Sequence, residues 1–335
     1  MPTSKILLIR LSSAGDIILT SPLLKLIKER EPASEIHFVV KSSYSDLIRH
    51  NPNIGAIHLV QEHANFDELK ALRRKLLREK FDLTLDLQNN FRSIYLRKGT
   101  SKRIKVVRKE IFKRALLVKI KLNFFSAIRP VALKYAQVYD RTIRQLPIPE
   151  IFFPQSLERK LDGIWKDLSL KDGNVVFLCP GSKHFTKRWP AENWKELARI
   201  ASKRSRIVLI GGKEDEEICK VIEEIGGPIN FCGKFSMLES AAILSHADLV
   251  ITNDSFLMHA ANALGKKIVA IFGSSVKEFG FFPYGVEYKI LEVDGLKCRP
   301  CSHIGRGSCP KKHFRCMVGI KPETVNEAAT ELLKQ

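Results

Sequence analysis

Residues 5–30 read KILLIRLSSAGDIILTSPLLKLIKER, and this stretch decides the fold class. The apolar run at 5–11 is typical of a strand that is buried on both faces. A short loop with serines and a glycine follows, and residues 17–30 then have the apolar spacing of a helix. A buried strand that leads directly into a helix is the repeating unit of a parallel sheet covered by helices.

Strand and helix patterns keep alternating along the rest of the chain. In the first half we expect strands at 36–40, 56–60 and 82–87, and helices at 66–79 and 132–146. Three prolines, charged clusters and weak periodicity predict a linker over about 147–173. In the second half we expect strands at 175–179, 206–210, 229–232, 248–252 and 268–272, and helices at 191–203, 214–225, 237–246 and 256–264. The sequence therefore predicts two doubly wound α/β units, in which ligands bind beyond the carboxyl ends of the strands.

The composition fits a folded protein with an anionic partner. The chain has 335 residues, of which 44% are hydrophobic, so it can form two domains and is not disordered as a whole. Its 56 Lys and Arg against 36 Asp and Glu give a net charge of +20, which predicts nucleic acid, an anionic lipid surface or a phosphorylated substrate as partner. No apolar run is long enough to span a membrane, and the N-terminus lacks the pattern of a signal peptide. We therefore expect the protein to stay in the cytoplasm.

Much of the positive charge lies in residues 92–121, which contain 12 basic residues and one acidic residue. Within and beyond this segment runs an apolar stripe at helical spacing, formed by Val107, Ile111, Ala115, Val118, Leu122 and Phe125. A basic amphipathic helix is typical of a membrane surface or an acidic ligand. The alternative is an ordinary helix that packs on its domain and leaves a basic face in water.

The loop after the first strand contains Ser13, Gly15 and Asp16. Gly15 permits a close backbone approach. Asp16 follows the carboxyl end of a strand, where a carboxylate can accept a proton from an attacking hydroxyl. Its alternative role is to cap the helix that follows. The glycine spacing of dinucleotide-binding loops is absent here.

Three loops of the second half are further candidates. The stretch PGSKHFTKRWP at 180–190 brings three cations close to Ser182, which suits either a phosphate cradle or a solvated basic loop. In the loop at 211–214, Glu214 could bind sugar hydroxyls or compensate the helix dipole. After the strand at 248–252, the backbone N–H groups of residues 255–257 form a candidate anion site. His259 lies within the following helix, where a packing role is the alternative.

Taken together, these stretches resemble one family. The segments RLSSAGDIILTSPLLKLIKE, DLTLDLQNNFRS, PGSKHFTKRWP, LIGGKEDEE, FCGKFSMLESAAILSHADLVITNDSFLMHAANALGKKIVAIFG and the late CRPC occur in the order found in the ADP-heptose:lipopolysaccharide heptosyltransferases of glycosyltransferase family 9. The resemblance implies a GT-B architecture, with two Rossmann-like domains that face a central cleft. It implies an acceptor domain over residues 1–155 and a nucleotide-sugar domain over residues 156–335, the latter with the cysteine-rich segment 298–316 and a C-terminal helix.

The resemblance also implies roles for individual residues in an inverting transfer that needs no metal. Asp16 matches the catalytic aspartate, and Lys187 matches the lysine that holds the donor phosphates. Phe256 departs from the family, whose members commonly have glycine there, so a bulky side chain stands beside the expected diphosphate site. The expected donor-binding residues are Ser182, Lys187, Glu214, Asp254, Ser255 and His259, and the expected acceptor-binding residues are Ser13, Gly15, Arg92 and Arg97.

The implied partners explain the basic segment. They are ADP-heptose, a lipid A acceptor that carries Kdo sugars, and the anionic surface of the inner membrane, to which the enzyme would bind peripherally. No specific nucleic acid is expected. Two other classes of protein share these features: a basic, Rossmann-like nucleic-acid-binding protein without transferase activity, and a nicotinamide dehydrogenase. Against the first, residues 92–121 have few aromatic side chains; against the second, the glycine fingerprint is missing.

The seven cysteines fall into two groups. Cys179, Cys219 and Cys232 lie in apolar stretches, where we expect buried, reduced thiols. The other four, Cys298, Cys301, Cys309 and Cys316, lie close together, and the first pair has the spacing of metal ligands. A structural zinc, reduced structural thiols and a disulfide or redox role are all compatible with this cluster. No cofactor is expected for catalysis.

Overall fold

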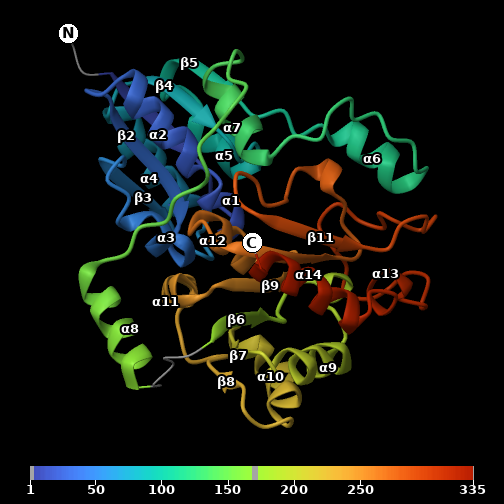
Figure 1. Ribbon diagram of the computed structural model, residues 1–335. Coiled ribbons are helices and arrows are strands. Elements are labelled where there is room, and N and C mark those ends of the chain that lie inside the picture. Colours follow the sequence, from blue (N-terminus) through green and yellow to red (C-terminus); the bar gives the residue numbers. More distant parts are fainter. Residues whose placement is uncertain (1–3, 168–172, 335) are drawn as a thin grey trace. The chain divides into compact units, whose positions relative to one another are not determined.

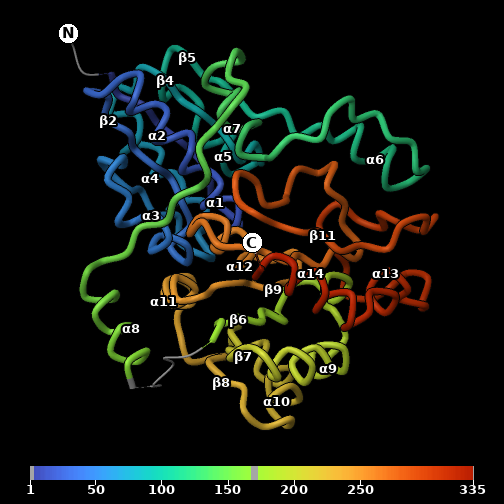
Figure 2. Tube along the Cα trace, in the orientation of Figure 1, coloured from blue at the N-terminus to red at the C-terminus, as the bar shows by residue number. Residues whose placement is uncertain are grey.

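The computed structural model describes residues 4–167 and 173–334, which form two α/β units (Figure 1). Unit 1 contains Met1–Lys109 and Val131–Phe152, and unit 2 contains Glu110–Pro130 and Phe153–Gln335. The expected boundary at residue 155 lies three residues from the observed one. The assignment of residues 110–130 to unit 2 was not predicted. Figure 2 traces the chain through residues 110–130.

Unit 1 is built on a parallel sheet with the strand order β3-β2-β1-β4-β5. Parallel neighbours need crossover connections, and helices supply them here. The strands are β1 (Lys5–Ile9), β2 (Glu35–Lys41), β3 (Ala56–Val60), β4 (Phe81–Asp86) and β5 (Ser101–Val106). The helices are α1 (Ala14–Ile18), α2 (Ser21–Arg30), α3 (Asp46–Arg49), α4 (Phe66–Arg78), α5 (Phe91–Arg97) and α7 (Val131–Tyr139).

Helices cover both faces of this sheet, which is why its central strands are apolar throughout. On one face, Leu7 and Ile9 of β1 pack with Leu69 and Leu76 of α4 and Leu96 of α5. On the opposite side, α2 and α7 pack together through a small cluster of Leu26, Ala136 and Ile143. Strand β5 was not predicted, because its lysines and arginine hide the strand pattern. Such charges are typical of an edge strand, where they oppose pairing with other chains.

A buried histidine pair links β2 and β3 of unit 1. His37 Nδ1 lies 2.9 Å from His58 Nε2, and His37 Nε2 lies 2.8 Å from Glu35 Oε1. Burial lowers the pKa of His58 to about 4, and the nearby His37 and Lys75 add to the shift. His58 is therefore neutral in the folded protein at pH 7.

This pair predicts a stability loss in mild acid. The unfolded chain binds a proton at His58 near pH 6.5, whereas the folded chain does so only near pH 4. Stability is therefore complete above about pH 6.5 and falls as the pH drops towards 4, by at most about 1.4 kcal/mol per pH unit. Denaturant titrations at several pH values should show this slope, and His58→Gln should flatten it. The exposed His63→Gln serves as control and should leave the slope unchanged.

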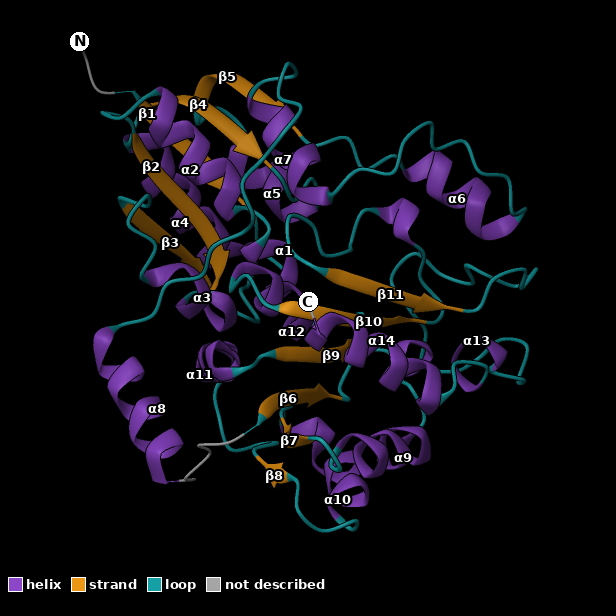
Figure 3. Cartoon of the chain, viewed as in Figure 1, coloured by secondary structure: helices purple, strands orange, loops and turns teal. Residues whose placement is uncertain are grey.

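Unit 2 contains a six-stranded sheet with the order β11-β10-β9-β6-β7-β8, and all its recorded pairings are parallel (Figure 3). The strands are β6 (Asn174–Cys179), β7 (Ser205–Leu209), β8 (Ile229–Asn230), β9 (Leu249–Asn253), β10 (Lys267–Phe272) and β11 (Tyr288–Glu292). The helices are α6 (Ile111–Lys119), α8 (Gln155–Asp167), α9 (Ala191–Ala201), α10 (Glu216–Glu223), α11 (Met237–Ile243), α12 (Phe256–Ala263), α13 (Arg315–Val318) and α14 (Pro322–Lys334).

The larger core of unit 2 lies under α9, α10 and α14. Trp189 and Trp194 are fully buried there against the alternate side chains of β6, β7, β9 and β10. Helices α11 and α12 contact each other, and α12 also contacts β9 and β10. The expected doubly wound α/β architecture is therefore confirmed for each of the two units. In the described residues no helix is both long and apolar enough to cross a membrane.

Four expected features differ from the structure. The helix expected at 132–146 ends earlier, because α7 spans only Val131–Tyr139. The helix expected at 17–30 is divided into α1 and α2, because Pro22 at the second position of α2 has no N–H to continue a helix from α1. The stripe expected over 107–125 is wrong: only α6 is helical, and its buried side chain is Leu117, which is not in the stripe. The expected linker contains α8, which contacts α11. Residues 168–172 of that linker lie outside the described residues.

Candidate active site

Asp16 lies in α1, which follows β1 directly. It is therefore close to the carboxyl end of β1, the central strand of the sheet. The N-cap residue Ser13 donates to Asp16 Oδ2 through its hydroxyl at 2.8 Å and its backbone N–H at 3.2 Å. The N-cap of this helix is therefore Ser13 and not Asp16, which is the third helical residue and accepts from the N-cap backbone. The other carboxylate oxygen, Asp16 Oδ1, takes no part in this cap and has different partners.

Asp16 Oδ1 is held by two buried groups that the sequence did not single out. Arg10 Nη2 lies 2.7 Å from this oxygen, and the Tyr135 hydroxyl donates to it at 2.6 Å. The Arg10 guanidinium also lies over the Tyr135 ring, 5.3 Å from its centroid. Burial raises the pKa of Asp16, but Arg10 and the hydroxyls of Tyr135 and Ser13 outweigh it, so the pKa is lowered. Asp16 is therefore an anchored carboxylate at neutral pH.

A second ion pair lies at the end of the neighbouring strand β4. Arg97 Nη1 is 2.5 Å from Asp86 Oδ2, and Asp86 is fully buried. The next turn is tied to the Asp16 loop, since Gln88 Oε1 accepts from the backbone N–H groups of Leu11 and Ser12. The positive charge of Arg10 also acts on Asp86. The two ion pairs therefore form one cluster.

The structure brings Ser13, Gly15 and Asp16 together, with the predicted Arg97 tied to the adjacent loop through Asp86. Arg92 is half-buried on α5. Arg10 was missed although it carries a signal: it is a cation at the end of an otherwise apolar strand. Tyr135 carries no such signal, because it reaches Asp16 from a helix that lies 119 residues later in the sequence.

In unit 2, Lys187 and Asp254 form a buried ion pair. Lys187 ends a short 3-10 turn after β6, and its Nζ lies 2.7 Å from Asp254 Oδ2. Ser275, after β10, donates to the same oxygen at 2.5 Å, and the Ser182 hydroxyl donates to the Asp254 carbonyl at 3.3 Å. Burial raises the pKa of Asp254, but Lys187 and Ser275 outweigh it, so this carboxyl is ionised. Three predicted donor residues thus meet at the carboxyl ends of parallel strands.

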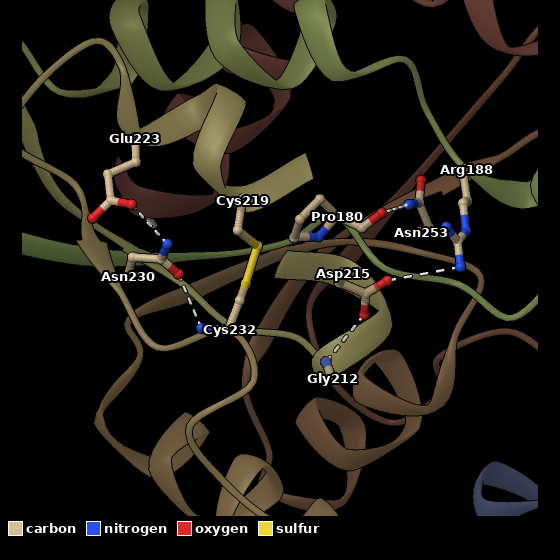
Figure 4. Close-up of a disulfide and its surroundings, with 9 residues drawn as sticks. All are labelled: Pro180, Arg188, Gly212, Asp215, Cys219, Glu223, Asn230, Cys232 and Asn253. Atoms are coloured by element: carbon tan, nitrogen blue, oxygen red, sulfur yellow. Dashed lines mark hydrogen bonds and ion pairs between the residues drawn. A yellow bond between two sulfur atoms is a disulfide. The ribbon is translucent and has the colours of Figure 1, made fainter. Parts of the chain in front are cut away.

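Asn253 fixes the loop that carries Lys187. Its side chain donates to the Pro180 carbonyl at 2.7 Å (Figure 4). It also accepts from the Trp189 backbone N–H at 3.2 Å. Hydrogen bonds therefore attach both ends of the loop 180–190 to the end of β9. This attachment limits the positions that the Lys187 side chain can take. Asn253 was quoted within a sequence motif, but its positioning role was not predicted.

The remaining donor candidates have separate surroundings. Ser255 is the N-cap of α12, and His259 is buried in that helix with its ring edge towards Phe281. Glu214 is exposed and folds back over Gly212. Its neighbour Asp215, which was not predicted, is buried against Gly181, where a side chain on the glycine would collide with it.

The four late cysteines are free thiols that line one small cavity of about 20 Å³ together with His313. Cys298 Sγ lies 3.8 Å from His313 Nε2. The donor types suit zinc, but in the described part of the chain no three His, Cys, Asp or Glu side chains converge as a metal site. We retain a structural zinc only as a proposal. Metal analysis of untagged protein tests it, since stoichiometric zinc supports the site and its absence removes it.

The expectation of reduced thiols is wrong for Cys219 and Cys232, which form a disulfide (Figure 4). Helix α10 and strand β8 are consecutive and packed together, which brings the two Cα atoms to 6.5 Å. Asn230 supports the second cysteine by accepting from its backbone N–H at 3.0 Å. Cys179 is a buried free thiol, as predicted.

The sequence model of glycosyltransferase family 9 (heptosyltransferase) matches residues 69–311, which is more than half of the chain. The chain belongs to glycosyltransferase family 9. This membership confirms the family resemblance and makes the protein a glycosyltransferase. The alternatives of a nucleic-acid-binding protein without transferase activity and of a nicotinamide dehydrogenase are thereby set aside.

Individual relatives of this glycosyltransferase agree along nearly the whole chain. It is 30% identical to lipooligosaccharide heptosyltransferase 2 of Campylobacter jejuni, covering 96% of this chain and 95% of that protein. It is 25% identical to lipopolysaccharide heptosyltransferase 2 of Escherichia coli, with 99% of both chains covered.

Among solved structures, a family 9 enzyme from Veillonella parvula has a TM-score of 0.82 at 23% identity, covering 99% of this chain and 97% of that one. E. coli heptosyltransferase II has a TM-score of 0.75 at 21% identity, with 99% of both chains covered. These two structures support the fold.

Proposed function

We propose that this glycosyltransferase moves a heptose from ADP-heptose to the inner core of lipopolysaccharide, with inversion and without a metal. The observation that carries the proposal is full-length similarity to proteins named lipooligosaccharide and lipopolysaccharide heptosyltransferase 2. The acceptor would be a Kdo-containing lipid A precursor, which is lipid-anchored and anionic. We therefore also propose that the enzyme acts at the cytoplasmic face of the inner membrane.

Asp16 is the proposed general base. Its Oδ1 stays anchored by Arg10 and Tyr135, while the acceptor hydroxyl takes the place of the exposed Ser13 hydroxyl at Oδ2. The lowered pKa keeps Asp16 ionised but makes it a weak base. Proton transfer then becomes favourable only as the hydroxyl oxygen bonds to the anomeric carbon and its proton becomes acidic. The proton leaves late, with the sugar–diphosphate bond already breaking.

The donor side supplies positive charge for the leaving diphosphate. Lys187 is held beside Asp254, and the N–H groups at the start of α12 point away from the helix. Negative charge grows on the diphosphate as the bond to the anomeric carbon breaks, and preorganised donors stabilise it without rearranging. Lys187 and the helix N-terminus would thus do what a divalent metal does in other nucleotide-sugar enzymes.

A transfer assay tests the proposed reaction. We expect purified enzyme to release ADP from ADP-heptose only when Kdo-bearing lipid A is present, at a rate that EDTA does not change. The anomeric configuration of the product, measured by NMR, should be inverted relative to the donor. Transfer only from UDP- or GDP-sugars, or a retained configuration, would contradict the proposal.

Tyr135→Phe tests how Asp16 is held. Loss of one hydrogen bond to the carboxylate raises its pKa, so the acidic limb of the kcat profile should move to higher pH while the KM for donor stays the same. Tyr139→Phe is a matched control on the same helix, because its hydroxyl donates to Glu31 at 2.5 Å instead. An equal shift in both variants would mean that Tyr135 acts only through the packing of α7.

A further inference from the structure

The segment 110–130, here called the strap, takes no part in the proposed reaction. It packs on unit 2 although the chain on both sides of it belongs to unit 1. Lys121 Nζ donates to the Pro300 carbonyl at 2.6 Å and to the Cys298 carbonyl at 3.3 Å. Asn123 Nδ2 donates to Glu278 Oε1 at 3.2 Å. These polar contacts hold one side of the strap.

Apolar and cation–π contacts complete this inner side. Leu117 is buried, with 7% of its surface exposed. The Arg114 guanidinium lies 6.0 Å from the centroid of Phe279, and the Phe125 ring meets the same ring edge-on at 6.5 Å. The strap is therefore attached to unit 2 through one defined face.

The strap also carries six apolar side chains that are open to solvent, and these are here called its outer side. Its exposed side chains, with their exposed fractions, are Ile111 (70%), Phe112 (74%), Ile120 (56%), Leu122 (50%), Phe124 (54%) and Ile128 (43%). Single exposed apolar residues are normal on a protein surface, but a concentration of this kind marks an interaction site.

Basic residues accompany these side chains. The strap contains five lysines and arginines against one acidic residue, and Arg108 and Lys109 precede it directly. Two of the five, Arg114 and Lys121, contact unit 2, which leaves Lys113, Lys119 and Arg129 beside the exposed apolar side chains. The single acid, Glu110, lies 3.8 Å from Lys113, which balances its charge. Apolar side chains flanked by cations are the composition of segments that lie in a membrane interface, with lysines at the headgroups.

We propose that the outer side of the strap docks on an anionic lipid surface and inserts Phe112, Phe124 and their aliphatic neighbours among the acyl chains. Lipid is favoured over nucleic acid because four of the six exposed side chains are aliphatic, whereas single-stranded nucleic acid is bound by stacking on aromatic rings. The proposal rests on this surface alone and not on the transfer reaction. Its readout needs neither donor nor acceptor, so each proposal can fail without the other.

Vesicle binding tests the insertion directly. The probe is sedimentation with vesicles of phosphatidylethanolamine and phosphatidylglycerol, compared with vesicles of phosphatidylcholine alone. We expect Phe112→Ser/Phe124→Ser to weaken binding to the anionic vesicles at least tenfold without a change of net charge. The matched control is Leu59→Ser/Phe66→Ser, which removes two exposed apolar side chains from unit 1 and should leave binding unchanged. Thermal denaturation of each variant checks that the fold is intact.

Two further measurements separate insertion from attraction between charges. Raising NaCl from 0.1 to 0.5 M should weaken wild-type binding but leave a part that the double variant lacks, because buried apolar contacts are not screened. In Phe112→Trp, brominated lipids should quench the added fluorescence, and in Phe66→Trp they should not. No binding by the wild type, an equal loss in the control, or binding that is abolished by salt and unchanged in the double variant would overturn the proposal. Oligonucleotide binding that depends on Phe112 in the absence of vesicle binding would overturn it as well.

Discussion

Asp16→Asn is expected to lower kcat by about 10²–10⁴-fold, the range associated with loss of a positioned proton acceptor. The amide has nearly the same shape, so Ser13 can still donate to its oxygen, but it cannot take up the acceptor proton. Affinity for ADP should be unchanged, because the expected donor residues all belong to unit 2. Steady-state kinetics and calorimetry with ADP measure the two quantities separately.

The buried partner of Asp16 makes a control necessary. Arg10 loses its counter-ion in this variant, and an unpaired buried charge destabilises the fold. Asp16→Asn combined with Arg10→Gln removes both charges, and it should recover thermal stability but not kcat. The exposed Asp46→Asn should behave as wild type, because its ion pair with Arg49 is on the surface. A folded Asp16→Asn enzyme with normal turnover would rule out the general-base role.

Lys187→Met should weaken ADP binding by roughly 10–100-fold, because a hydrogen bond from a charged group is worth about 1.5–3 kcal/mol. It should also destabilise unit 2 by about 3–5 kcal/mol, since Asp254 is left buried without its cation. A second substitution separates the loss of ADP affinity from the loss of stability. Adding Asp254→Asn should restore the melting temperature, whereas ADP affinity should stay low.

Two further variants show whether Lys187 binds ADP or only stabilises the fold. Lys183→Met changes an exposed lysine of the same loop and should leave ADP affinity nearly unchanged, which tests whether the loss is specific to residue 187. Asp254→Asn alone keeps the Lys187 cation but removes the carboxylate that holds it, so it should weaken ADP binding less than Lys187→Met does. If the double variant regains both stability and ADP affinity, Lys187 has only a structural role.

The predictable part of the site follows from the regular geometry of parallel sheets. Lys187 and Asp254 are 67 residues apart, yet each follows the carboxyl end of a strand of the same sheet, so their meeting could be expected. Asp16 could be placed for the same reason. What local patterns could not predict are partners from distant elements, such as Tyr135, and residues whose neighbours are set by packing, such as Asp215.

In the fold, too, some elements could be predicted from local patterns and others depend on packing. Strands buried on both faces were visible as apolar runs, whereas the edge strand β5 was hidden by its charges. The helix expected across 107–125 failed because helical spacing does not say which element a face will meet, and Leu117 proved to be the buried side chain. The disulfide between Cys219 and Cys232 depends on how α10 and β8 approach each other, which spacing alone does not fix.

The interruption of unit 1 by the strap has a consequence for biosynthesis. On the ribosome, β1 to β5 emerge first, but α7 follows only after the strap has been made. Until then the Arg10–Asp16 pair lacks the Tyr135 hydroxyl, and Leu26 of α2 lacks Ala136 of α7. A nascent chain that ends at residue 109 is therefore an incomplete domain with an exposed apolar helix face. Unit 1 can close only once residues belonging to its neighbour have already been translated.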